Sequence, residues 1–239
     1  MNRRLTLSVS LTALMASLCL ALPAAAQEAP SRLQRIKDTG TIVISYQESA
    51  VPFSYMSPEG PIGFGIDIAR RVAQAVKVQL GLPELKVRWN PVTLSTRFPM
   101  ITTNTVDLEC LTTTNTAERQ KMVSFSNTFY VSEEAIAVQR DSKLQSAADL
   151  RGARIAVVRG TTTEAALAGK GMNLVAESTN RRAMNALVEG RADAYVAAAS
   201  IIAGESYRLD NAGVVRLLGS EGSQEAFGCM LPKGDAAFK

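Results

Sequence analysis

The chain has 239 residues, of which 46% are hydrophobic and 20% are charged, as is typical of a folded protein with one or two domains. Its net charge of +4 is too small to predict a nucleic-acid partner. The sequence contains no histidine, which removes the usual general base and the commonest metal ligand, and we expect no cofactor.

The first 26 residues have the layout of a secretory signal peptide. Arg3 and Arg4 form a basic head, an apolar run covers residues 5–22, and residues 24–26 form an alanine cleavage site. A membrane anchor is the alternative, because the run could nearly span a bilayer, but the Pro-Ala-Ala-Ala end favours cleavage. We therefore expect a soluble periplasmic protein, with 24 basic and 22 acidic residues after cleavage.

Helices and strands alternate in the first half of the remaining chain. We expect, in chain order, a helix at 31–40, a strand at 41–46, a helix at 66–80, a strand at 85–92, a helix at 95–104 and a strand at 106–110. Gly40 ends the first helix, and Gly81 and Pro83 end the second. The alternation predicts a parallel sheet with helices on its faces.

The same pattern restarts in the second half. We expect strands at 133–140, 154–158, 173–178, 193–198, 213–219 and 225–233, with helices at 146–152, 161–169, 180–189 and 200–207. No Gly/Ser-rich or Pro-rich linker separates the halves, so we predict two lobes that are joined by crossing strands. The predicted boundaries are 27–132 for lobe 1, 133–227 for lobe 2 and 228–239 for a return to lobe 1, with crossings near 129–139 and 224–231.

Two hydroxyl-rich turns follow predicted strands. One is Thr112-Thr113-Thr114, after the strand that ends at Cys110, and the other is the segment 160–163, Gly-Thr-Thr-Thr. Ligands of open α/β sheets bind beyond the carboxyl ends of strands, where hydroxyls and free backbone N–H groups hold anionic oxygens. A helix cap is the alternative for Thr161 or Thr162, but it does not explain a similar turn in both halves.

Five segments carry motifs of a known family: 48–55 (ESAVPFSY), 63–76 (GFGIDIARRVAQAV), 107–126 (DLECLTTTNTAERQKMVSFS), 159–167 (RGTTTEAAL) and 223–239 (SQEAFGCMLPKGDAAFK). Through them the chain resembles the polar amino-acid solute-binding proteins of ABC importers (family 3), above all the glutamate/aspartate-binding branch. The resemblance implies an α/β, type II periplasmic-binding-protein fold, in which two lobes and two crossing hinge strands enclose one small ligand. Members of that family continue with a terminal helix, which we expect to be missing here because the sequence ends at Lys239.

The resemblance also implies ligand-binding residues. Arg119 stands where the family grips the α-carboxylate, helped by Thr112 and Thr114, while Thr162 reaches across from lobe 2. A guanidinium holds a carboxylate through two parallel charge-assisted bonds that lysine cannot copy. A surface ion pair with Glu118 is the alternative for Arg119.

Three further residues complete the expected surroundings of the ligand. Arg97 matches a family arginine near the ligand's side-chain carboxylate. Thr161 neighbours the threonine that reaches across the cleft. Phe53 is an aromatic wall of the cleft or, alternatively, a core residue.

Four positions depart from the family pattern. Gln47 replaces an arginine for the side-chain carboxylate, Leu94 replaces a serine, and Asn180 replaces a histidine. Ala198 stands where the family places the aspartate that pairs with the ligand's α-ammonium. A buried ammonium without a counter-charge costs several kcal/mol, so these changes bear on the identity of the ligand.

Two interpretations of the ligand follow. The first is an amino acid whose ammonium is bound by another acid, Glu48 or Glu177. The second is a dicarboxylate or keto acid that has no ammonium. Arg159 either restores the positive charge missing at Gln47 or is a solvated residue at a strand end.

The sequence thus predicts a monomeric, non-catalytic receptor that captures a small carboxylate, of the glutamate/aspartate type, for an inner-membrane ABC permease. A dehydratase-like enzyme on this fold is the alternative, and it needs a positioned general acid or base. Export also bears on Cys110 and Cys229, the two cysteines left after cleavage. They are a candidate disulfide in an oxidising compartment, and two buried thiols are the alternative.

Overall fold

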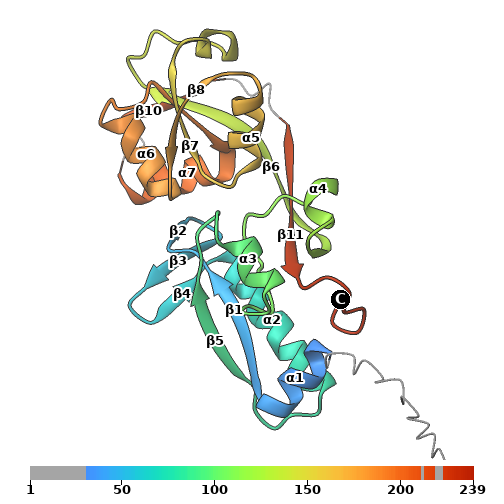
Figure 1. The fold of residues 1–239 in the computed structure, drawn as a ribbon. Helices are drawn as coiled ribbons and strands as arrows, with labels where there is room; N and C mark the ends of the chain where they lie inside the picture. Colours follow the sequence, from blue (N-terminus) through green and yellow to red (C-terminus); the bar gives the residue numbers. More distant parts are fainter. Residues whose placement is uncertain (1–30, 211–212, 219–222) are drawn as a thin grey trace, which may run out of the picture.

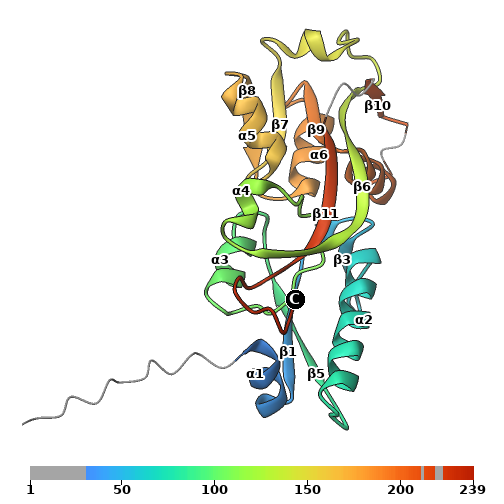
Figure 2. The ribbon, with the colours of Figure 1, turned by 90° about the vertical axis from the view of Figure 1, so that its right-hand side faces the viewer.

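The computed structural model describes residues 31–210, 213–218 and 223–239, so the predicted signal peptide lies outside the described residues. Within these ranges the chain forms two α/β units, one above the other, and two long strands run between them (Figures 1 and 2). No helix in the described part of the chain is long and apolar enough to cross a membrane.

The first unit contains the elements α1 (Arg32–Thr39), β1 (Thr41–Tyr46), β2 (Ser49–Ala50), β3 (Ser54–Ser57), β4 (Gly60–Ile62), α2 (Phe64–Gln79), β5 (Lys86–Pro91), α3 (Arg97–Thr102) and α4 (Ala117–Gln120). Strands β1 and β5 pair in parallel, and β2, β3 and β4 form a separate antiparallel sheet that the sequence analysis missed. The strand predicted at 106–110 is wrong. That segment forms isolated bridges at Leu108 and Glu109, because it crosses between β1 and a distant strand instead of extending one ladder.

The second unit contains β7 (Arg154–Val158), α5 (Thr162–Gly169), β8 (Asn173–Glu177), α6 (Asn180–Val188), β9 (Ala194–Ala198), α7 (Ala199–Arg208) and β10 (Val215–Leu218), with a 3₁₀ helix at Ala147–Leu150. Its sheet has the order β10-β6-β9-β7-β8. β7 runs parallel to β8 and β9, whereas β6 (Ser124–Gln139) is antiparallel to β9 and β10. The predicted parallel sheet is therefore mixed, since β6 enters from the first unit against the direction of the others.

The two connecting strands are β6 and β11 (Gln224–Leu231), which pair antiparallel. Residues 124–133 of β6 pair with β11, and residues 134–139 pair with β9 and β10. Strand β6 is thus part of the connection between the units and part of the second sheet. Both connecting strands include the residues predicted for the crossings. The lobe boundaries at 132 and 227 stay a prediction.

Buried apolar residues form a separate core in each unit. In the first unit, Ile36, Ile42 and Ile44 pack against the buried face of α2. In the second, β7 is an almost continuous buried run because helices cover one face of the sheet and loops and α5 cover the other. Each fully buried aliphatic side chain contributes about 1.5–3 kcal/mol. A further buried cluster, of Ala50, Phe53, Ile201 and Phe227, joins the two units beside the connecting strands.

A disulfide joins Cys110 to Cys229, with a Cα–Cα distance of 4.1 Å, so the predicted bridge is confirmed. The two cysteines are 119 residues apart in the sequence. The bond links the segment that contains Cys110, in the first unit, to β11. The second unit therefore lies within the loop of chain that the bond closes.

Reduction of this disulfide is expected to destabilise the protein strongly. Closing a loop of this length lowers the entropy of the unfolded chain and so stabilises the folded protein by roughly 5 kcal/mol, which corresponds to a melting temperature lower by about 10–20 °C after reduction. Calorimetry of the wild type with and without reductant, beside the double variant Cys110→Ala/Cys229→Ala, measures this. An unchanged melting temperature in both comparisons would contradict a structural role for the bond.

Thr161 caps helix α5. A helix cap was one of the two interpretations of the turn at residues 160–163. Its side chain accepts a hydrogen bond from the Glu164 backbone N–H at 3.0 Å and donates one to the Val158 carbonyl at 2.7 Å. The first hydrogen bond satisfies a helical donor that has no partner within the helix. This cap fixes the start of the helix and leaves Thr162 facing the first unit.

Thr161→Ala is expected to lower the free energy of unfolding by about 1 kcal/mol, because it removes the helix cap. Thr161→Ser keeps the hydroxyl and is the matched control, with a loss of only a few tenths of a kcal/mol. Urea denaturation followed by circular dichroism distinguishes the two. Equal losses for alanine and serine would show that the hydroxyl does not act as the cap.

Candidate functional site

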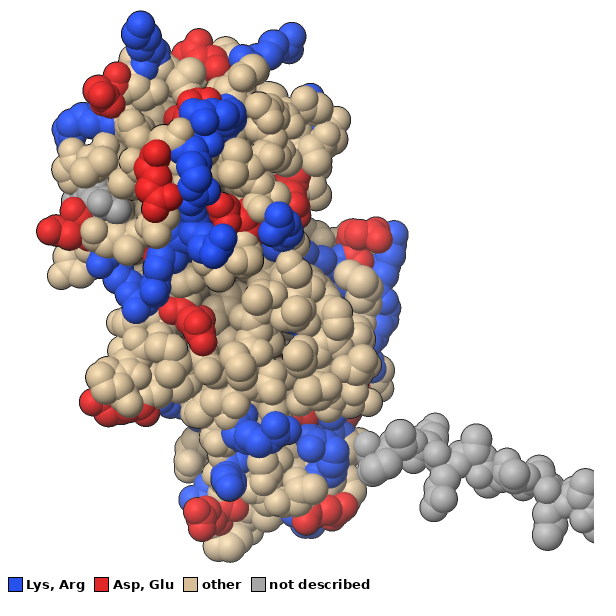
Figure 3. Space-filling view, turned by 60° about the vertical axis from the view of Figure 1, so that its left-hand side comes forward, with Lys and Arg blue, Asp and Glu red and all other residues tan. Residues whose placement is uncertain are grey.

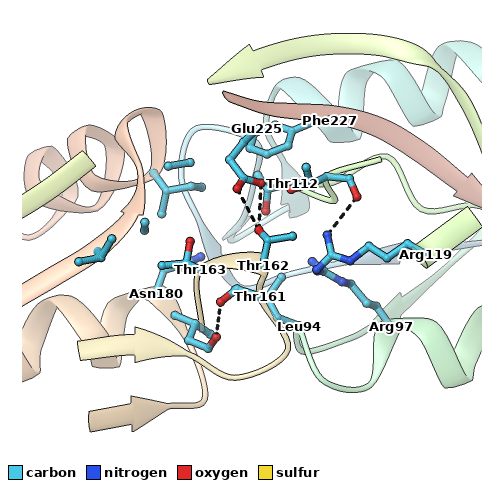
Figure 4. Close-up of a pocket in the computed structure, with 16 residues that line it drawn as sticks. Leu94, Arg97, Thr112, Arg119, Thr161, Thr162, Thr163, Asn180, Glu225 and Phe227 are labelled. Atoms are coloured by element: carbon cyan, nitrogen blue, oxygen red, sulfur yellow. Dashed lines mark hydrogen bonds between the residues drawn. The ribbon is translucent and has the colours of Figure 1, made fainter. Parts of the chain in front are cut away.

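A cavity lies between the two units, beside the connecting strands (Figure 4). Residues from both units and from β11 line it: Leu94, Arg97, Thr112, Thr114, Arg119, Val158, Thr161, Thr162, Thr163, Asn180, Val196, Ala197, Ala198, Ile201, Glu225 and Phe227. Polar side chains enter from loops and helix N-termini, and apolar ones come mainly from β7, β9 and β11.

Most of the residues predicted from the sequence meet at this cavity. Eight of them line it: Arg97, Thr112, Thr114, Arg119, Thr161, Thr162, Asn180 and Ala198. The two hydroxyl-rich turns, which lie far apart in the sequence, therefore face each other across one space.

Three predicted residues lie outside this cavity. Gln47 lines a neighbouring cavity, which shares Leu94 and Asn180 with the first one. Phe53 is buried in an aromatic cluster with Tyr130 and Phe227, so its alternative as a core residue describes it better. Arg159 is exposed, and its backbone rather than its charged group contacts neighbouring segments.

Two buried guanidinium groups point into the cavity from the first unit (Figure 4). Arg97, at the start of α3, is 1% exposed, and Arg119, on α4, is 8% exposed. Arg119 donates to the Thr114 carbonyl at 3.0 Å and to the Gly160 carbonyl at 3.2 Å. Arg97 donates to the same Gly160 oxygen at 3.3 Å. One carbonyl of the second unit therefore meets both arginines.

Local packing fixes both guanidinium groups. Each lies over the ring of Phe98, at 5.4 Å for Arg97 and 5.3 Å for Arg119. Thr116 caps α4, because its hydroxyl accepts a hydrogen bond from the Arg119 N–H at 3.2 Å. The sequence Thr-Ala-Glu-Arg thus folds into a short capped helix that aims its arginine at the cavity.

Burial leaves the two positive charges under-compensated. It lowers the pKa of Arg97 to about 10, although the negative charges of Glu109 and Glu225 oppose this effect. Burial also lowers the pKa of Arg119, against the attraction of the same two carboxylates. Among the described residues, nothing accepts a hydrogen bond from the Nε or Nη1 atom of Arg97. These two nitrogens are fully buried and lack the acceptor that a buried donor normally has.

The three threonines at residues 112–114 have two different roles. Thr112 and Thr114 line the cavity. Thr113 is fully buried and donates instead to the Glu109 carboxylate at 2.6 Å. Burial raises the pKa of Glu109, opposed by Arg97 and by hydrogen bonds from Thr113 and Ser45. Glu109 thus supports the arginines from behind, outside the cavity.

Glu225 is the functional candidate that the sequence analysis missed. It is 5% exposed on β11, and its carboxylate accepts hydrogen bonds from the hydroxyls of Thr114 and Thr162. The distances from Thr162 are 2.9 Å to Oε1 and 3.1 Å to Oε2 (Figure 4). Its motif, Gln-Glu-Ala-Phe-Gly-Cys, was part of the resemblance but was not assigned to the site.

The two acids proposed from the sequence as counter-charges do not line this cavity. Glu177 forms ion pairs with Arg182 at 3.1 Å and Arg191 at 2.8 Å. Glu48 is exposed and lines the neighbouring cavity.

Figure 3 shows basic and acidic side chains close together on the outer face of the second unit, a surface of mixed charge.

Known proteins are similar to this chain over most of its length. A family model for bacterial extracellular solute-binding proteins, family 3, matches residues 42–238. The L-glutamate/L-aspartate-binding protein of Pseudomonas aeruginosa is 37% identical over 99% of this chain and 80% of its own length. The glutamate/aspartate import solute-binding protein of Escherichia coli is 33% identical over 90% of this chain and 74% of its own length.

Solved structures agree on the fold. An ancestral arginine-binding protein bound to glutamine is 27% identical with a TM-score of 0.73, covering 83% of this chain and 86% of its own. An ancestral amino acid-binding protein, a precursor of cyclohexadienyl dehydratase, is 28% identical with a TM-score of 0.75, covering 87% and 88%.

These matches confirm the predicted two-lobed α/β fold of periplasmic binding proteins. The two curated relatives are binding proteins and not enzymes, as the sequence predicts for this chain. The chain belongs to the bacterial extracellular solute-binding proteins, family 3.

Proposed function

We propose that this chain is the periplasmic solute-binding component of an ABC importer and captures an amino acid of the glutamate/aspartate type. Relatives named for glutamate and aspartate cover nearly the whole chain and support this substrate class. The protein acts as an exported monomer that delivers its ligand to an inner-membrane permease. It performs no chemistry on the ligand.

One observation carries the proposal: two buried guanidinium groups converge on the cavity, and two nitrogen atoms of Arg97, Nε and Nη1, have no acceptor among the described residues. A buried cation in this state gains from a carboxylate, because the ligand restores both charge balance and hydrogen bonds. Arg119 binds the α-carboxylate, and Arg97 binds the carboxylate of the side chain or shares the first one.

Ligand binding favours the closed arrangement of the two lobes. The cavity takes Arg119 and Thr114 from the first unit and Thr162 from the second, so a ligand that contacts all three stabilises the closed state. The lobes extend over residues 27–132 and 133–227, and residues 228–239 return to the first.

A receptor for a dicarboxylate or keto acid is the second candidate. Ala198 lines the cavity with a methyl group where the family pattern implies an aspartate for the ammonium. A ligand without an amino group would not need that acid.

A thermal-shift screen of the purified mature protein tests the proposal. The panel contains L-glutamate, L-aspartate, neutral amino acids, succinate and 2-oxoglutarate. A ligand raises the melting temperature by mass action, by about 2.7 kcal/mol of stabilisation at 100 times its Kd. No shift with any small carboxylate would overturn the proposal.

Arg119→Lys is expected to weaken the binding of the best ligand by roughly 10- to 100-fold, although it keeps the positive charge, because lysine cannot form two parallel hydrogen bonds to a carboxylate. Arg71→Lys is the matched control, since Arg71 is exposed on α2. Isothermal titration calorimetry measures both. Wild-type affinity in Arg119→Lys would contradict the carboxylate clamp.

A further inference from the structure

We propose that Glu225 binds the α-ammonium group of the ligand, so that the site selects amino acids over carboxylates that lack the amino group. This inference rests on the proposed function and deepens it, since it names the residue that decides between the two ligand classes. It rests on where Glu225 lies, on how its carboxylate is held and on which charges surround it.

The position of Glu225 compensates for Ala198. Strands β9 and β11, which carry these two residues, flank β6 on opposite sides, with Ala198 opposite Glu134 and Glu225 opposite Ser132. Both residues line the cavity, and Glu225 is the one carboxylate that does so in the part of the chain that the structure describes. Glu225 therefore offers the cavity a carboxylate from the side of β6 opposite to Ala198.

Two threonine hydroxyls hold the Glu225 carboxylate in one orientation. Thr114 holds it from the first unit and Thr162 from the second, and the side chain is 5% exposed. A carboxylate offers about four acceptor sites, and two hydroxyl donors leave some of them for a third donor. An ammonium group brings three donors to this acceptor.

The charges around Glu225 match a zwitterion. Its negative charge acts on Arg119, which lines the same cavity and binds the α-carboxylate in the proposed function. The ammonium and carboxylate of an α-amino acid share one carbon atom, so their binding site needs an anion beside a cation. Glu225 and Arg119 supply this pair.

A dicarboxylate would meet the opposite situation. Its carboxylates would approach Glu225 without a positive group between them, and like charges in a buried site repel each other strongly. Glu109 cannot take the place of Glu225, because it lies outside the cavity lining and accepts hydrogen bonds from Thr113 and Ser45.

The test compares two ligands that differ by the amino group, L-glutamate and glutarate, by calorimetric titration of the wild type and Glu225→Gln. In the wild type, L-glutamate is expected to bind at least tenfold more tightly than glutarate. Glu225→Gln keeps the shape and an oxygen acceptor for the threonines but loses the charge. It should weaken L-glutamate binding by roughly 10- to 100-fold and leave glutarate binding unchanged or stronger.

Two further variants guard against an indirect effect. Glu134→Gln removes a charge from the adjoining strand, where the carboxylate accepts a hydrogen bond from Thr163 at 2.8 Å, and should leave the ratio of the two affinities unchanged. Ala198→Asp combined with Glu225→Gln returns an acid to the cavity and should restore the preference for L-glutamate.

The outcomes separate this inference from the proposed function. An unchanged ratio of L-glutamate to glutarate affinity in Glu225→Gln would overturn the role of Glu225 and leave the receptor intact. Glutarate binding more tightly than L-glutamate in the wild type would do the same. If the wild type binds neither ligand nor any other carboxylate of the thermal-shift panel while the disulfide-bonded protein is folded, both proposals fail.

Discussion

Arg97 and Arg119 lie side by side and are almost fully buried, and their neighbours offset the cost of burying two positive charges. Two neighbouring guanidinium groups repel each other and lose hydration. Glu109 offsets this cost from behind, the Gly160 carbonyl and the Phe98 ring contact both groups, and Glu225 faces them from β11. The compensation is incomplete at Arg97, whose Nε and Nη1 atoms have no hydrogen-bond acceptor among the described residues.

The backbone around the disulfide keeps these groups in register. Near the Cys110–Cys229 bond, Gly228 N–H donates to the Thr113 carbonyl at 3.1 Å, and Asn115 N–H donates to the Ala226 carbonyl at 2.8 Å. These contacts hold the threonine triplet against β11. As a result, the hydroxyls that face the cavity and the carboxylate of Glu225 belong to one rigid assembly, although 111 residues separate Thr114 from Glu225.

That separation also explains what could be predicted from the sequence. The arginine and threonines of 112–119 lie in one local motif, and the helical and strand periodicities located most elements. The role of Glu225 depends on the pairing of β11 with β6, which local pattern does not reveal. Arg159 shows the same limit for a single residue. The turn that follows it was predicted correctly, but the side chain of Arg159 is exposed, and it is the carbonyl of the next residue, Gly160, that contacts the arginines.

The mixed sheet was missed for the same reason. Alternating helices and strands indicate parallel pairing within a lobe, and β7, β8 and β9 follow that rule. β6 does not, because its direction is set by its passage between the units. The elements that were predicted wrongly are thus those whose direction or pairing depends on contacts between residues far apart in the sequence.

Close approach of the two units depends on two glycines. A Cβ atom at Gly160 would lie 2.6 Å from the Leu94 carbonyl oxygen, and one at Gly204 would lie 2.1 Å from the Val51 carbonyl oxygen. Each contact joins the second unit to the first, so backbone meets backbone there without an intervening side chain. Gly160 also has a φ of 82°, which glycine adopts without strain. The same residue therefore permits the contact between the units and brings its carbonyl to both arginines, so the packing of the two units and the position of the guanidinium groups depend on one glycine.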